Sequence, residues 1–99
     1  MDSTFMSNCA NHPKEVAGIS DMSILAEKIA SLHYATLAEF LERLADNLYA
    51  DAARDHNAGR HSLAGQLNGA SVDIRQAHLS IRRAWNISKP FMNPSTTNQ

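Results

Sequence analysis

The sequence is poor in residues that break helices or cross-link a fold. Its 99 residues include one cysteine, three prolines and four glycines, and only 6 % are aromatic. A single cysteine, Cys9, cannot form an intramolecular disulfide, which excludes a disulfide scaffold. A free thiol is typical of the reducing cytoplasm. We therefore predict a cytoplasmic protein.

Membrane segments and targeting signals are also missing from the sequence. No apolar run approaches the roughly 18 residues of a transmembrane helix. Residues 1–19 lack the basic and apolar regions of a signal peptide. We therefore expect no contact with a membrane.

What remains is a short chain of helical composition. Its length allows one domain. Hydrophobic residues make up 43 %, but fifteen of them are alanine, so bulky core residues are few. The net charge of −1 excludes a strongly basic nucleic-acid coat and an acidic disordered tail.

A first helical pattern begins at Ser20 or Asp21 and ends near Gly59. Aspartate is a favoured N-cap residue, and glycine is favoured just beyond a helix end. An apolar stripe recurs every three or four residues, close to the heptad of a helix-pairing seam. It consists of Ala26, Ala30, His33, Leu37, Phe40, Leu44 and Leu48. The pattern also allows a short separate helix that ends in a bend between His33 and Thr36.

A second helical pattern begins near His61 and carries a heptad without interruption. Its seam residues are spaced alternately by four and three: Leu63, Leu67, Ala70, Ile74, Ala77, Ile81 and Ala84. Asn68 and Gly69 could break this helix, with Ser71 capping a new one. The heptad keeps its phase across both residues, so we favour one continuous helix.

Two long helices joined by a short turn predict an all-α antiparallel hairpin. We expect a flexible arm over residues 1–19, the helical hairpin over 20–88 and a flexible tail over 89–99. Two helices alone bury too little apolar surface to offset the entropy of ordering them. Val72 and Leu79 also lie on the face opposite Ile74. We therefore expect a homodimer that forms a helical bundle, although the arm or the tail could cover that face instead.

The small net charge conceals two opposite halves. Residues 21–58 contain seven acidic and three basic residues, whereas residues 59–99 contain one acidic and five basic residues. Arg75, Arg82 and Lys89 recur every seven residues beside the second seam. Such flanking charges typically direct helix pairing. Alternatively, Arg75, Arg82 and Arg83 form a surface for an anionic partner.

No pattern of catalytic residues is present, and we predict a protein that is not an enzyme and uses no cofactor. His56 and His61 flank the turn, with Asp51 and Asp55 one helical turn earlier. Imidazole and carboxylate groups can bind a divalent ion. The simpler interpretation is a polar turn in which arginines neutralise the two aspartates, so we predict no metal site.

Residues 62–83 are also compatible with a helix-turn-helix. Asn68 would lie in the turn, and Ser71 would begin a recognition helix with Arg75 among the base-contacting residues. Gly69 departs from this motif, which has a bulky apolar residue at that position. DNA binding is therefore the alternative function.

The segment from Leu37 to Trp85 resembles the small derepression (epsilon) proteins of satellite phages. The similar stretches are Leu-Ala-Asp-Asn-Leu-Tyr-Ala-Asp-Ala, Gly-Arg-His-Ser-Leu-Ala-Gly-Gln-Leu and Val-Asp-Ile-Arg-Gln-Ala, and the segment covers about half of the chain. The resemblance implies an antirepressor, which binds a transcriptional repressor and keeps it from its operator. It implies no catalytic residues and identifies no contact residues.

The predicted function is stoichiometric binding to another protein. The expected binding residues lie on the outer surface of the second helix and in the tail: Val72, Arg75, Leu79, Arg82, Arg83, Phe91 and Met92.

Overall fold

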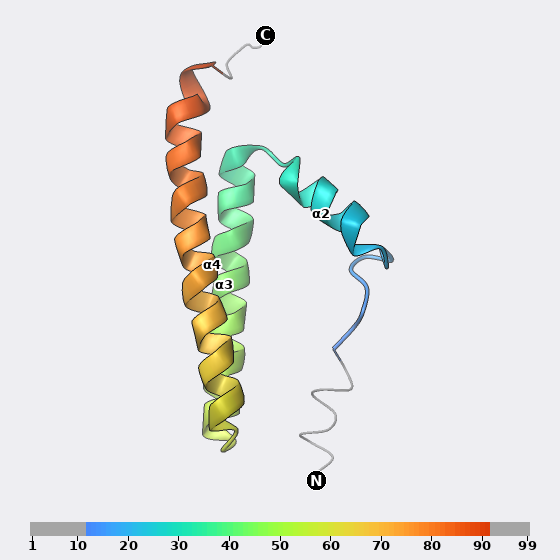
Figure 1. The fold of residues 1–99 in the computed structure, drawn as a ribbon, viewed down its shortest axis with the longest axis vertical. Helices are drawn as coiled ribbons and strands as arrows, with labels where there is room; N and C mark the ends of the chain where they lie inside the picture. Colours follow the sequence, from blue (N-terminus) through green and yellow to red (C-terminus); the bar gives the residue numbers. More distant parts are fainter. Residues whose placement is uncertain (1–11, 92–99) are drawn as a thin grey trace. The chain divides into compact units, whose positions relative to one another are not determined.

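The computed structural model describes residues 12–91, and the chain is all-α over that range (Figure 1). Its elements are the α-helices α2 (Met22–Ala30), α3 (Tyr34–Asn57) and α4 (His61–Ser88), followed by the 3-10 turn η1 (Lys89–Phe91). Over the same residues there is no strand, only an isolated bridge between Val16 and Ile19. The all-α fold class is confirmed.

The chain divides into two compact units, Met1–Ser31 and Leu32–Gln99. The start of the helical domain at residue 20 stays a prediction. In the first unit, α2 begins at the predicted N-cap. The Asp21 carboxylate accepts hydrogen bonds from the backbone N–H groups of Ser23 (2.9 Å) and Ile24 (3.3 Å), which the first helical turn leaves without helical partners.

A short break separates α2 from α3, so the single helix over 21–57 is wrong and the two-helix alternative is correct. His33 causes the break, because its backbone is extended (φ −50°, ψ 139°) and its Nδ1 accepts a hydrogen bond from the Ala35 N–H at 3.1 Å. This residue was expected on the apolar stripe and is instead an exposed N-cap. Its ring also lies against that of Trp85 in α4, with centroids 4.5 Å apart.

The turn between α3 and α4 has the hydrogen bonds of a Schellman motif. The Gly59 N–H donates to the His56 carbonyl (3.0 Å), and the Arg60 N–H donates to the Asp55 carbonyl (2.8 Å). Gly59 has φ +86°, a conformation that favours glycine. The position predicted for Gly59, just beyond the helix, is confirmed.

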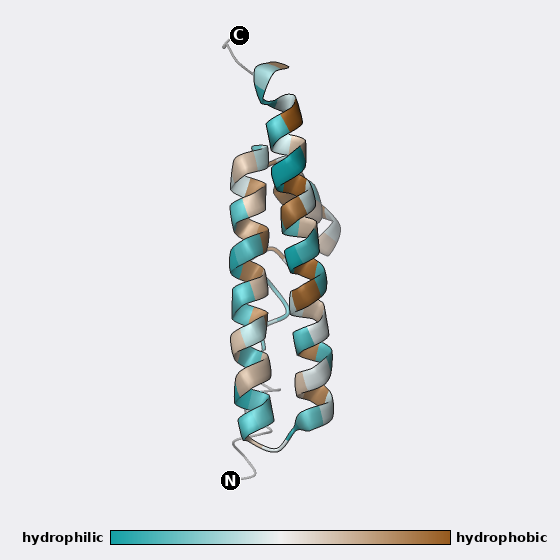
Figure 2. Cartoon of the chain, turned by 90° about the vertical axis from the view of Figure 1, so that its left-hand side faces the viewer, coloured by the Kyte–Doolittle hydropathy of each residue, from teal (hydrophilic) through white to brown (hydrophobic). Residues whose placement is uncertain are grey.

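Helices α3 and α4 lie side by side and run antiparallel along a seam of small residues (Figures 1 and 2). Each helix contributes three buried residues spaced by seven: Ala38, Ala45 and Ala52 from α3, and Ala64, Ser71 and His78 from α4. Small side chains at a seam allow two helix backbones to approach closely. Apart from His78, no buried side chain among residues 12–91 is larger than serine.

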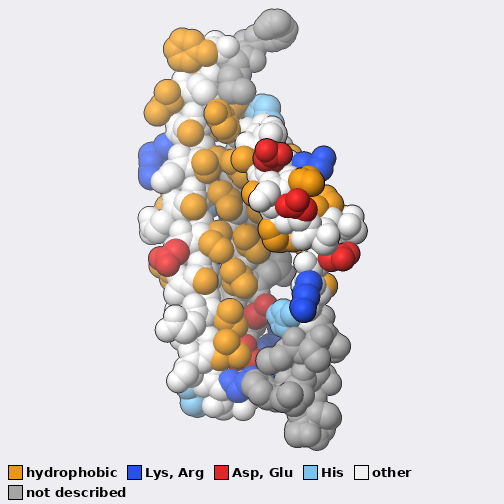
Figure 3. Space-filling view, turned by 45° about the vertical axis from the view of Figure 1, so that its right-hand side comes forward, with side chains coloured by type: hydrophobic (Ala, Val, Ile, Leu, Met, Phe, Trp, Pro, Cys, Tyr) orange, Lys and Arg blue, Asp and Glu red, His pale blue; other side chains and the backbone are white. Residues whose placement is uncertain are grey.

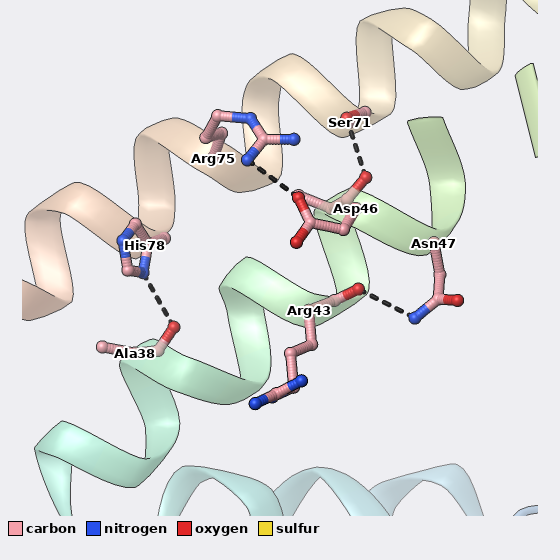
Figure 4. A network of polar contacts seen from close by, with 8 residues as sticks. Ala38, Arg43, Asp46, Asn47, Ser71, Arg75 and His78 are labelled. Atoms are coloured by element: carbon pink, nitrogen blue, oxygen red, sulfur yellow. Dashed lines mark hydrogen bonds and ion pairs between the residues drawn. The ribbon is translucent and has the colours of Figure 1, made fainter. Parts of the chain in front are cut away.

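Two hydrogen bonds cross this seam and show how close the helices are (Figure 4). The Ser71 hydroxyl donates to the Ala45 carbonyl at 2.9 Å, and His78 Nδ1 lies 2.8 Å from the Ala38 carbonyl. A carbonyl oxygen only accepts, so His78 Nδ1 carries a proton. The two bonded pairs are seven residues apart in each helix, so they follow the same register. A further step of seven residues sets Ala52 opposite Ala64.

The predicted seam of α3 has the correct period but the wrong phase. The buried row, Ala38, Ala45 and Ala52, begins one position after Leu37. Phe40 and Leu44, expected in the seam, are exposed by 37 % and 36 %. The physical reason is that the leucine and phenylalanine side chains are too large for the narrow gap between the backbones, which alanine fills.

In α4 one of the two predicted seam rows is correct. Leu67, Ile74 and Ile81 are half-buried along the seam. The other predicted row, Leu63, Ala70, Ala77 and Ala84, is displaced by one residue from the observed row of Ala64, Ser71, His78 and Trp85. Polar residues in the seam were not expected, and Ser71 and His78 are accommodated because each forms a hydrogen bond with the facing backbone.

Helix α4 continues without interruption from His61 to Ser88, which confirms the continuous alternative. Asn68 and Gly69 are both helical. A helix-turn-helix needs a turn near Asn68, so the assignment of that motif to residues 62–83 is wrong.

Replacing Gly69 by alanine is expected to stabilise the protein by about 1 kcal/mol, because glycine in a helix interior carries an entropic cost of that size. Apart from the neighbouring helix backbone, a Cβ atom at Gly69 would have no atom within 4 Å, so the gain is not offset by a clash. Urea unfolding followed by circular dichroism measures the effect. Gly59→Ala is the matched control and should destabilise, because its backbone has positive φ. Equal shifts in both variants would contradict this account.

Candidate interaction surface

One side of the α3–α4 hairpin presents bulky apolar side chains along its length. In each helix they lie beside the row of buried small residues, most of them one residue before or three residues after a member of that row. Because the helices run antiparallel, both sets emerge on the same side of the hairpin. We call this surface the apolar face; it comprises Leu37, Phe40, Leu41, Leu44 and Leu48 from α3, and Leu63, Leu67, Ala70, Ile74, Ala77, Ile81 and Ala84 from α4.

The apolar face is incompletely covered. Leu41, Ile74 and their neighbours along the seam are half-buried, whereas Phe40, Leu44 and Leu63 are exposed by 37 %, 36 % and 40 %. Figure 3 shows hydrophobic side chains as a band that follows the hairpin. Contiguous apolar surfaces of this kind mark interaction sites in soluble proteins.

Charged side chains are segregated from the apolar face. None of its twelve positions is charged, and the first charge in the row of Leu37 and Leu44 is Asp51, near the turn. The opposite side of the hairpin carries Asp46 on α3 and Arg75 on α4, which form an ion pair at 3.1 Å (Figure 4). Alternation of hydrophilic and hydrophobic bands along the helices is visible in Figure 2. The two sides of the hairpin are therefore chemically distinct.

The Arg75–Asp46 pair connects the basic helix with the acidic one, as expected if flanking charges direct helix pairing. Both side chains keep substantial exposure, 42 % for Arg75 and 61 % for Asp46. Exposed ion pairs contribute about 0–1 kcal/mol, so this pair orients the helices more than it stabilises them.

The predicted binding residues on α4 lie away from the apolar face. Val72 follows Ala70 by two residues, which places it about 200° further round the helix. Val72 and Leu79 are exposed by 50 % and 44 %. Arg82 and Arg83 are exposed, and Arg83 donates to the Ser80 hydroxyl at 3.1 Å.

The predicted residues of the tail are only partly described. Phe91, in η1, is 85 % exposed. Met92 lies outside the described residues. The structure therefore brings together Val72, Leu79 and the nearby arginines on one helix, and it leaves their binding role a prediction.

Sequence reasoning missed the apolar face because it assigned Phe40, Leu44 and Leu63 to the core. A signal was present, since the three positions belong to rows that stay free of charge along most of each helix. A buried seam and an uncovered face share that signal. Only the observed packing separates them.

The polar residues at the turn are arranged as the simpler interpretation predicted. Arg54 forms an ion pair with Asp51, and Arg60 forms one with Asp55 at 2.8 Å. The two aspartates are thus neutralised by arginines. The remaining pair, His56 and His61, lines an open pocket on the charged side of the hairpin together with Tyr49, Asn57 and Asn68.

Two further kinds of feature are missing from the part of the chain that the structure describes. Residues 12–91 contain no group of three or more His, Cys, Asp or Glu side chains arranged to hold a metal ion. No helix in that range combines the length and the apolar character needed to cross a bilayer. Comparison of the chain with protein-family models, curated proteins and solved structures finds no match.

Proposed function

We propose that this protein acts by stoichiometric binding and that its first partner is a second copy of the same chain. The observation that supports the proposal is the apolar face, a continuous uncharged surface beside a seam of small residues. Such a thin seam contributes little hydrophobic stabilisation, since burial contributes about 25 cal/mol per Å² of apolar area. Covering the apolar face with a second hairpin gives a four-helix bundle with a larger core.

The apolar face suits a symmetric partner. In a two-fold dimer the same surface meets itself, so any charge on it would oppose its own copy. The face carries none. With 24 residues, α3 is about 36 Å long, and two helices of about 10 Å diameter make a face of roughly 700 Å². Standard interfaces bury about 800 Å² per partner.

In such a dimer the outward residues of α4 remain available to another protein. Val72 and Leu79 would supply apolar contacts, and Arg82 and Arg83 would attract an acidic surface. If the resemblance of residues 37–85 to satellite-phage derepression proteins holds, that second protein is a transcriptional repressor. The proposed mechanism is then antirepression by direct capture, without catalysis.

DNA binding is less well supported. The basic residues of α4 lie on an uninterrupted helix, and Arg75 already pairs with Asp46 at 3.1 Å. A gel-shift titration tests the alternative, because phosphate contacts weaken steeply with salt. Retention of DNA at low salt that is lost in an Arg75→Ala, Arg82→Ala variant would favour it.

Self-association is tested by light scattering at micromolar concentration. The native chain should have the mass of two chains. The double variant Phe40→Glu, Leu44→Glu should have the mass of one, because each dimer would bury four uncompensated charges. Both residues are more than one-third exposed in the hairpin, so helical circular dichroism should persist.

The matched control is Val72→Ser, Leu79→Ser, which changes two exposed apolar residues on the other side of α4. This variant should keep the mass of two chains and lose capture of a repressor in a pull-down. A native protein with the mass of one chain contradicts the dimer. Loss of the dimer in the control, with the Phe40 and Leu44 variant unaffected, would place the interface at Val72 and Leu79 instead.

A further inference from the structure

Two histidines face each other across the turn of the hairpin. His56 lies in the last turn of α3, and His61 is the first residue of α4. Their Nδ1 atoms are 3.0 Å apart, their ring centroids are 4.6 Å apart, and the ring planes are inclined by 66°. The Schellman turn places the two backbone positions close together, because the Gly59 and Arg60 N–H groups hold the chain to the end of α3.

The rings are not aligned as a straight hydrogen-bonded pair. In such a pair the centroid separation exceeds the nitrogen separation by two ring radii. The observed excess, from 3.0 Å to 4.6 Å, is less than two imidazole ring radii. The rings are therefore tilted from the N···N line, and rotation of these two exposed side chains can direct both Nδ1 lone pairs at one ion.

We propose that His56 and His61 form a bidentate site for a divalent transition-metal ion, bound by the two Nδ1 atoms. A metal–nitrogen distance of about 2.0–2.1 Å and the 3.0 Å separation give an N–metal–N angle of roughly 91–97°. That angle matches adjacent positions of a square-planar or octahedral ion. It is narrower than the tetrahedral angle that Zn²⁺ adopts at structural sites. The geometry therefore selects Cu²⁺ or Ni²⁺, which prefer tetragonal nitrogen and oxygen ligands.

The surroundings leave the other coordination positions to water. The nearby carboxylates of Asp51 and Asp55 are held by Arg54 and Arg60. The pocket beside the imidazoles is open and is lined by the polar side chains of Tyr49, Asn57 and Asn68. These groups can hydrogen-bond metal-bound water, and the open pocket gives an ion access from solvent.

Binding requires both Nδ1 atoms to be unprotonated. Without metal, one Nδ1–H donates to the other Nδ1 at 3.0 Å. That proton moves to Nε2 of the same ring when the ion binds, so a neutral pair changes tautomer without net proton release. Both Nε2 atoms then serve as donors.

Titration of the untagged full-length chain with Cu²⁺, in a Cys9→Ser background that removes the thiol, tests the site. Isothermal calorimetry should give one ion per chain, and electron paramagnetic resonance should show coordination by two nitrogens. Ni²⁺ should bind with the same stoichiometry and more tightly than Zn²⁺. His56→Ala and His61→Ala should each weaken Cu²⁺ binding at least tenfold.

His12→Ala is the matched control, because His12 is an exposed histidine far along the sequence from the pair. It should bind Cu²⁺ like the native chain. Undiminished binding in His56→Ala or His61→Ala, or binding that is lost only in His12→Ala, overturns the site. The light-scattering mass reports on the dimer and not on metal binding. Failure of the metal site can therefore be distinguished from failure of the dimer.

Discussion

Replacing Ala45 by leucine is expected to destabilise the hairpin by about 3 kcal/mol, near the upper end of the usual range for an overpacked core. Ala45 is 0 % exposed, and its carbonyl accepts the Ser71 hydroxyl at 2.9 Å. A leucine at this position would separate the two backbones and break that hydrogen bond. The free energy of unfolding from urea titration, at a fixed chain concentration, measures the loss.

Ala50→Leu is the matched control, since it makes the same substitution at an exposed position of α3. Its free energy of unfolding should stay within about 0.5 kcal/mol of the native value, as is usual for surface substitutions. If Ala45→Leu proved as stable as the control, the close-packed seam would be incorrect.

The second large effect is expected at His78. Replacing it by alanine should lower the free energy of unfolding by about 2 kcal/mol. The change removes a buried ring, leaves a cavity and deletes the hydrogen bond from Nδ1 to the Ala38 carbonyl. His78→Leu separates these contributions, because it fills much of the space without the hydrogen bond. It should lose about 1 kcal/mol.

Urea unfolding of both His78 variants measures these losses, with His61→Ala as the exposed control. A loss of the same size in His61→Ala would show that the effect is not specific to the seam. Equal stability of His78→Leu and His78→Ala would show that the ring volume contributes nothing.

Local signals in the sequence located most helix ends correctly. Asp21 and Gly59 have the N-cap and C′ roles that their residue types favour, and α4 ends at Ser88, shortly before Pro90. His33 was not foreseen as a cap, because its apolar neighbours on both sides continue the helical period. Its role depends on one hydrogen bond from Ala35 and on the ring contact with Trp85.

The seam was predicted with the right period and the wrong rotation for a physical reason. Burial was assigned to the largest apolar residues, as in an ordinary core. In this hairpin the backbones approach until Ser71 and His78 bond the facing carbonyls, so only small side chains fit at Ala38 and Ala45. The leucines that were expected in the seam lie on the apolar face instead.

The candidate sites differ in how far the sequence could reveal them. Exposure of Val72 and Leu79 followed from their position opposite Ile74 and is confirmed. The proximity of His56 and His61 was foreseen from their places around the turn. The 3.0 Å separation of their Nδ1 atoms was not foreseen, because it depends on side-chain rotation and on the conformation of Gly59.

The common register of the seam restricts how the length of this chain can vary. A single-residue insertion or deletion within α3 or α4 rotates everything beyond it by about 100°. Ser71 would then no longer face Ala45, and a bulky side chain would enter the gap between the backbones. Within α3 and within α4, only insertions and deletions of a whole heptad therefore keep the rotation of the seam, and fusion tags or inserted epitopes belong outside these two helices.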